Sequence, residues 1–124
     1  MKEISLYINS DDLARVTEIL RKHNVGGISF YEVHAAGRRE REAVPEMVRN
    51  YMTGRKVTPE YLKRTKVETI VSDSAMNQIV DDISNSLGQQ AGDKARGMIF
   101  IKDVSDAIEI GGTKDRGEAA LTRK

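Results

Sequence analysis

Cysteine is absent from the sequence, which excludes a disulfide framework, a zinc–thiolate site and a cysteine nucleophile. A strong excess of one charge is also missing. The formal net charge is +1, so the overall balance does not call for a nucleic-acid partner or an anionic membrane. No apolar run approaches the length of a membrane span, and the opening MKEISLYIN holds no apolar signal segment. We therefore expect a cytoplasmic protein without direct membrane insertion, and its 124 residues suit one domain.

Alternating polarity predicts a strand at residues 2–8. Its apolar face carries Ile4, Leu6 and Ile8. A helix is expected next, with Ser10 as its N-cap and acidic residues in its first turn, where negative charge suits the helix dipole. The apolar stripe of this helix consists of Leu13, Val16, Ile19 and Leu20. A pair of glycines ends the helix, and a second strand is predicted at residues 28–33.

The same unit then recurs in the second half of the chain. A strand is predicted at residues 66–71, a capping segment at 72–74 and another strand at 98–104. The helix between them ends at Gly88, and its apolar stripe consists of Met76, Ile79, Val80, Ile83 and Leu87. Two such halves predict an α+β fold of the ferredoxin-like βαββαβ type, with both helices on one face of an antiparallel sheet. Residues 107–110 suggest either a fifth strand or an edge extension.

A long insertion, residues 35–64, separates the two strands that should be central. Connections of this length are uncommon in compact domains, so the segment is expected to be functional or disordered. It contains eight lysines and arginines against four glutamates, a balance of +4 that leaves −3 for the rest of the chain. The positive charge is therefore concentrated in the insertion.

Glycine and basic residues recur together in the insertion and in two further connections, residues 88–97 and 111–124. Glycine lets backbone N–H groups approach a phosphate, and lysine or arginine balances its charge. The basic residues of the two further connections include Lys94, Arg96, Lys114 and Arg116. None of the three segments has P-loop spacing, so a solvated charged loop or an ordinary turn remains the alternative interpretation.

Metal and catalytic patterns are weak. His23 and His34 have no acidic or cysteine cluster at ligand spacing, so we expect no metal site and no catalytic site. An RNA-binding sheet would expose aromatic side chains on its central strands. The strands do not match the RRM signature, although Phe30 and Tyr31 leave that option open.

Four motifs in order resemble the PII signal-transduction family, also called nitrogen regulatory protein P-II. They are GGISFYEVHAAGRR, KVETIVSD, GMIFIKDVSDAIEI and TKDRGEAAL. The similarity covers nearly the whole chain and indicates a divergent member, with an archaeal source as one option. It implies a single PII-like domain over residues 1–124, with a T-loop at 35–64, a B-loop at 88–97 and a C-terminal loop at 111–124.

By this resemblance the protein is a non-catalytic regulator in nitrogen or carbon metabolism. It would form a homotrimer, bind an adenine nucleotide (ATP, ADP or AMP) in the clefts between subunits, and control a partner through its T-loop. An ammonium transporter or a metabolic enzyme is the expected kind of partner. The alternative is a ferredoxin-like trimer with a structural, metal-binding or small-anion-binding role and no nucleotide sensing. An acylphosphatase-like enzyme is a third possibility, without a matching motif.

The resemblance also implies a set of residues around the nucleotide. They are Tyr7, Gly27, Ser29, Ala35, Gly37, Arg38, Arg39, Arg64, Glu68, Ile70, Lys94, Arg96, Gly97, Met98, Thr113 and Arg116. Tyr51 is expected to contact the partner protein.

Several positions depart from the family pattern. Arg39 stands where the family has a glutamine that helps to hold magnesium and 2-oxoglutarate, and a guanidinium cannot coordinate a cation. Met98 replaces a family lysine, and Glu109 and Gly111 fall where the family has arginines. We therefore do not expect the usual assembly of magnesium, ATP and 2-oxoglutarate. Arg39 would instead pair with an anion directly.

Overall fold

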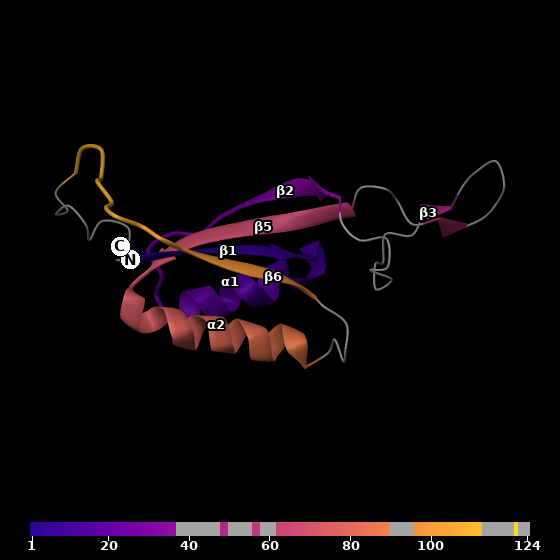
Figure 1. Cartoon of the computed structure of the whole chain (residues 1–124), viewed down its shortest axis with the longest axis horizontal. Helices are drawn as coiled ribbons and strands as arrows, with labels where there is room; N and C mark the ends of the chain where they lie inside the picture. The colour runs from indigo at the N-terminus through magenta and orange to yellow at the C-terminus, as the bar shows by residue number, and fades with distance from the viewer. Residues whose placement is uncertain (37–47, 50–55, 58–61, 90–95, 113–120, 122–124) are drawn as a thin grey trace.

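A computed structural model describes residues 1–36, 48–49, 56–57, 62–89, 96–112 and 121. Its main sheet has the strand order β2-β5-β1-β6, and every neighbouring pair is antiparallel. The four strands are β1 (Lys2–Ile8), β2 (Ser29–Ala35), β5 (Leu62–Val71) and β6 (Gly97–Asp103). This order is the one expected of a ferredoxin-like βαββαβ fold, so the predicted α+β fold class is confirmed (Figure 1).

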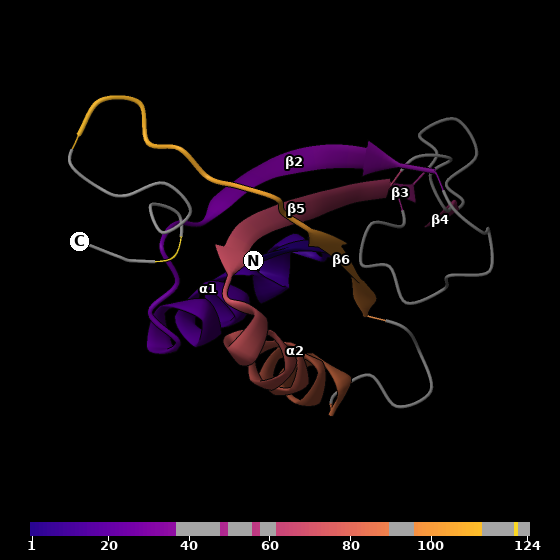
Figure 2. The same ribbon diagram turned by 60° about the vertical axis from the view of Figure 1, so that its left-hand side comes forward.

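Two helices cover one face of the sheet (Figures 1 and 2). A 3₁₀ turn, η1 (Ser10–Asp12), leads into α1 (Leu13–Lys22), and α2 (Asp73–Gly88) follows β5 directly. Ser72 caps α2, because its Oγ accepts the backbone N–H of Ala75 at 3.2 Å. Within the described residues, no helix has the length and apolar character needed to cross a membrane.

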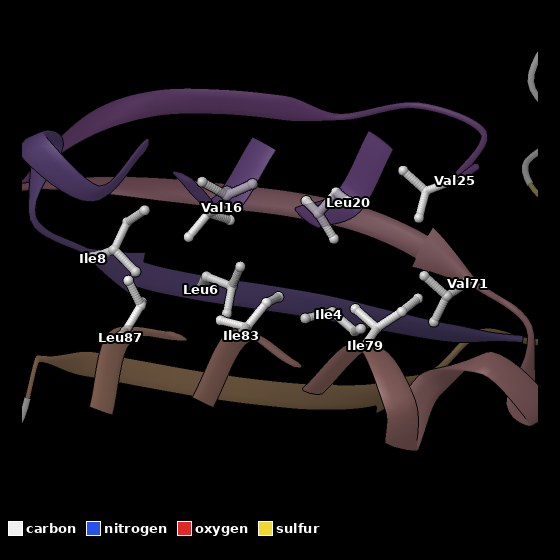
Figure 3. Packing of buried hydrophobic residues seen from close by; sticks show 11 residues of the cluster. Ile4, Leu6, Ile8, Val16, Leu20, Val25, Val71, Ile79, Ile83 and Leu87 are labelled. Carbon is white, nitrogen blue, oxygen red and sulfur yellow. The ribbon is translucent and has the colours of Figure 1, made fainter. Parts of the chain in front are cut away.

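The core lies between the sheet and the two helices, where the apolar stripes predicted from the sequence meet. Figure 3 shows the side chains of Ile4, Leu6 and Ile8 directed toward Ile79, Ile83 and Leu87 of α2. Val16 and Leu20 of α1 are completely buried in the same cluster. The apolar residues that alternate in β1 and those at helical spacing in α1 and α2 therefore lie in one common core.

Two local predictions were wrong. Ser10 does not cap α1: it lies in η1, and its hydroxyl hydrogen-bonds to that of Thr65 at 3.0 Å. Residues 107–110 form neither a fifth strand nor an edge extension; their backbone is irregular and leads to Gly111 and Gly112, which have positive φ. Ile108 and Ile110 are exposed there, so no local burial favours a strand.

The insertion is also shorter and less uniform than predicted. β2 continues to Ala35 and β5 begins at Leu62, so both strands extend into the segment expected to be a loop. Two-residue strands, β3 (Val48–Arg49) and β4 (Lys56–Val57), pair with each other within it.

Candidate functional site

The sheet face opposite the helices presents a continuous row of polar and aromatic side chains, which we call the open face. The strand register defines its members, because cross-strand partners point to the same side and β1 turns its alternate residues toward the helices. They include Tyr7, Ser29, Tyr31, Lys66, Glu68, Ile70, Met98 and Phe100. No helix in the described part of the chain covers this face (Figure 2).

An ion pair lies at the centre of the open face. Glu68 accepts hydrogen bonds from Lys66 Nζ at 3.1 Å and from the hydroxyl of Tyr31 at 3.0 Å. The hydrogen bond from Lys66, followed by that from Tyr31, lowers the pKa of Glu68. The same bond to Glu68, followed by interactions with Tyr31 and Tyr7, raises the pKa of Lys66. Both groups therefore keep their charge at neutral pH.

Aromatic rings surround this ion pair. The ammonium of Lys66 lies 5.3 Å from the ring centre of Tyr7 and 5.7 Å from that of Tyr31, within the range of a cation–π interaction. Tyr7 also meets Phe100 edge to face, with the ring centres 5.8 Å apart. The open face can therefore offer a flat apolar ligand both ring surfaces and a fixed carboxylate.

A second group of polar residues lies at one end of the sheet, which we call the loop end. Here β1 and β2 finish while β5 and β6 begin, because Ile8 lies opposite both Thr65 and Gly97 and Ala35 lies opposite Leu62. The expected T-loop and B-loop both join the sheet at this end (Figure 1).

Two arginines at the loop end are held by the turn that follows β1. Arg64 Nη1 donates to Asn9 Oδ1 at 2.5 Å, and Arg96 Nη2 donates to both carboxylate oxygens of Asp12, at 2.8 and 3.1 Å. Asp12 is 4% exposed and Arg64 is 9% exposed. A buried charge needs a partner of this kind, so the turn fixes the direction of both guanidiniums.

Gly97 and Gly27, two of the candidate residues, have different structural roles. A Cβ at Gly97 would clash with the backbone carbonyl oxygen of Tyr7, so only glycine allows β6 to lie this close to β1. At Gly27 no atom would meet a Cβ. There the backbone carbonyl matters instead, because it accepts the hydroxyl of Thr69 at 2.6 Å and ties the start of β2 to β5.

The structure brings most of the described candidate residues to these two places. Tyr7, Ser29, Glu68, Ile70 and Met98 share the open face. Arg64, Arg96, Gly97 and Ala35 lie at the loop end, and Gly27 precedes β2. The remaining candidates lie outside the described residues: Gly37, Arg38, Arg39, Tyr51, Lys94, Thr113 and Arg116.

The residues expected around the nucleotide did not include four residues that complete these groups. Tyr31 and Lys66 had a detectable signal, since the alternation of β2 and β5 places them on the same face as Ser29 and Glu68. Asn9 and Asp12 had no such signal in the sequence, because their partners are 55 and 84 positions away in the chain. Only the folded arrangement pairs them.

Metal chemistry has no support in the described ranges. They contain no group of three or more histidine, aspartate or glutamate side chains placed to hold an ion. His23 Nε2 and Asp82 Oδ2 lie 2.6 Å apart and join the end of α1 to α2. Two such groups do not complete a coordination shell.

Comparison with known proteins gives a consistent result. The family model described as "Nitrogen regulatory protein P-II" matches residues 1–114. The chain is 31% identical to Nitrogen regulatory protein P-II 2 of Methanothermobacter thermautotrophicus over 121 residues, 98% of this chain and 97% of the relative. It is 31% identical to Nitrogen regulatory protein P-II of Porphyra purpurea and 30% identical to Nitrogen regulatory protein P-II 1 of Escherichia coli K12. Each of these two alignments covers 98% of this chain and 100% of the relative.

Proposed function

The chain belongs to the nitrogen regulatory protein P-II family, and from this premise we propose that it is a non-catalytic cytoplasmic regulator that binds an adenine nucleotide. The nucleotide would lie against the open face and the loop end. Its binding would set the conformation of the segment 35–64, which would then act on a partner protein. A change of ligand that favours one arrangement of a segment is a population shift.

One observation carries the proposal: among the described residues, an aromatic surface and two arginines that we assign to the base and the phosphates lie in adjoining places. The open face offers aromatic and apolar surface around Glu68, which suits a flat base. The loop end offers two guanidiniums, Arg64 and Arg96, which suit phosphate oxygens. The Arg96 side chain is 28% exposed, so a ligand phosphate can approach its guanidinium.

We further propose that magnesium and 2-oxoglutarate are not required for binding. Arg39 brings a cation where the family has an amide that helps to hold magnesium. An arginine at that position favours a direct ion pair with the ligand anion. We expect nucleotide binding to survive chelation of magnesium.

The assembly would be a homotrimer. An isolated chain leaves apolar side chains exposed on the open face and beyond it, and burial against other copies would remove this surface from water. The exposed side chains include Phe30, Tyr31, Met98, Phe100, Ile101, Ile108 and Ile110. A trimer would also place each candidate nucleotide site near a neighbouring chain.

Isothermal titration calorimetry of the full-length protein tests this function. ATP, ADP, AMP and cyclic AMP are each titrated with and without magnesium and 2-oxoglutarate. Binding of at least one of the adenine nucleotides without magnesium is the expected result. Absence of heat with every nucleotide would overturn the proposal and favour a purely structural ferredoxin-like trimer.

A further inference from the structure

The turn between β1 and α1, residues 9–12, touches the flanks of both expected loops. Asn9 holds Arg64 and the hydroxyl of Ser10 meets that of Thr65, both at the start of β5. Asp12 holds Arg96, which directly precedes β6. Three side chains of one short turn therefore contact the C-terminal ends of both loop segments, 35–64 and 88–97.

Asp12 is the charged member of this turn. Its carboxylate is 4% exposed, and its only side-chain partner in the described part of the chain is Arg96 Nη2, which both oxygens accept. A carboxylate buried to this degree cannot turn into water when its partner leaves. Losing Arg96 would therefore leave an uncompensated buried charge.

Arg96 is more accessible than its partner. Its side chain is 28% exposed, and a guanidinium carries five N–H donors, of which the Asp12 contact uses one nitrogen. Because of this exposure, the guanidinium can meet a solvent-borne anion, but the Asp12 carboxylate already neutralises its charge.

We propose that the Asp12 carboxylate is an internal competitor for the anionic part of the ligand at the loop end. It occupies the Arg96 guanidinium in the free protein, and a ligand phosphate must displace it or share Arg96 with it. Asp12 therefore lowers the affinity for phosphate-bearing ligands and sets the concentration at which they bind. This inference rests on the proposed function, because it assumes that a nucleotide phosphate reaches Arg96.

Asp12→Asn provides the test, since it keeps the shape of the side chain and removes its charge. Calorimetric titration of the full-length variant with ATP and ADP should show binding about tenfold tighter than in the wild type, the factor that corresponds to about 1.4 kcal/mol at 25 °C. Adenosine, which has no phosphate, should show no gain. The gain in affinity should disappear in the double variant that also carries Arg96→Gln, because Asp12 affects the ligand only through Arg96.

Asp11→Asn is the matched control. Asp11 is an exposed carboxylate in the same 3₁₀ turn, next to Asp12, so its removal changes the net charge equally without touching Arg96. We expect the affinity of Asp11→Asn for ATP to stay within about twofold of the wild type, because an exposed charge that is screened by salt has only a small effect on binding. An equal gain in Asp11→Asn would overturn the competition, because the effect would then reflect total charge alone.

A measurement on the wild type covers the case in which Asp12→Asn fails to fold. The side-chain carboxyl carbon of Asp12 and the guanidinium of Arg96 can be followed by NMR during titration with ADP. Competition predicts that both signals shift together as ADP binds. A bound nucleotide that leaves the Asp12 carboxyl signal unchanged would overturn the inference.

The outcomes separate this inference from the proposed function. Tighter binding of ATP and ADP to Asp12→Asn supports the competition. Unchanged or weaker binding to a folded Asp12→Asn, with normal binding to the wild type, overturns the competition and leaves the regulator intact. No binding of any nucleotide to either protein overturns the proposed function and the role of Asp12 with it.

Discussion

Two single arginines carry the anion binding that we propose at the loop end. Arg64 and Arg96 are held in place by Asn9 and Asp12, so their direction is fixed before any ligand arrives. Pre-organised donors of this kind lose little freedom on binding. The basic residues of segment 35–64 would add to this fixed pair.

Arg38→Ala should weaken ATP binding about 5- to 150-fold, because a hydrogen bond to a charged group contributes ~1–3 kcal/mol. Arg38 lies outside the described residues, and the PII resemblance places it beside the phosphates. Calorimetric titration of the variant measures the change. Arg41→Ala, in the same charged run, is the control, and equal weakening in both would show that Arg38 has no special contact.

Glu68→Gln should change how stability depends on pH. Lys66 and Tyr31 lower the pKa of Glu68 below its ordinary value of 4.5, so the folded protein binds that proton less readily than the unfolded chain. The stabilisation is fully present above pH 4.5 and is lost as the pH falls through the lower folded value. Urea unfolding across this range should show a shallower acid loss in Glu68→Gln than in the wild type.

Glu3→Gln controls for general charge removal on the same face. Glu3 lies opposite Ile70 and Lys102, so its variant leaves the contacts of Glu68 with Lys66 and Tyr31 in place. Glu3→Gln should therefore flatten the acid loss less than Glu68→Gln does. The attribution to Glu68 would be wrong if Glu3→Gln flattened the acid loss as much as Glu68→Gln.

The sequence predicted the elements whose periodicity comes directly from burial. β1 and the two helices follow their apolar stripes into one core, because spacing alone decides which face is buried. The strands β2 and β5 extend further than predicted, and in the extension the exposed residues His34 and Lys63 lie opposite each other. Backbone hydrogen bonds hold the two strands together there, although the sequence shows no alternation of polar and apolar residues.

The candidate site could be predicted only in part. The open face follows from alternation once the strand order is known, which is why Tyr7, Ser29 and Glu68 are together. The Asp12–Arg96 pair joins positions 84 residues apart, and no local pattern encodes such a contact. Ser10 looked like a cap because serine suits that role, whereas the 3₁₀ turn places its hydroxyl against Thr65.

Gly97→Ala should destabilise β6 by about 1–3 kcal/mol, the usual cost of overpacking. The added Cβ would meet the backbone oxygen of Tyr7, and backbone in a central strand cannot move aside cheaply. Urea unfolding of the variant measures the loss. Gly88→Ala, where a Cβ would meet nothing at the end of a helix, should be neutral or slightly stabilising. Equal stability of the two variants would contradict the close approach of β6 to β1.

The whole molecule combines a basic insertion with an apolar and aromatic open face. The insertion carries +4 and the remainder −3, so the region expected to meet ligand and partner is electrostatically distinct from the body. The exposed aromatic side chains on the sheet favour self-association, which would bring three loop ends into one assembly. Nucleotide binding and assembly are therefore expected to depend on each other.

Native mass spectrometry of the full-length protein with ADP tests both parts of this expectation together. The prediction is a species with three times the 13.8 kDa mass of one chain, carrying up to three ADP molecules. Guanosine diphosphate at the same concentration, which controls for nonspecific adducts, should remain largely unbound. A monomer, or a trimer that carries no more ADP than guanosine diphosphate, would contradict a trimeric adenine-nucleotide regulator.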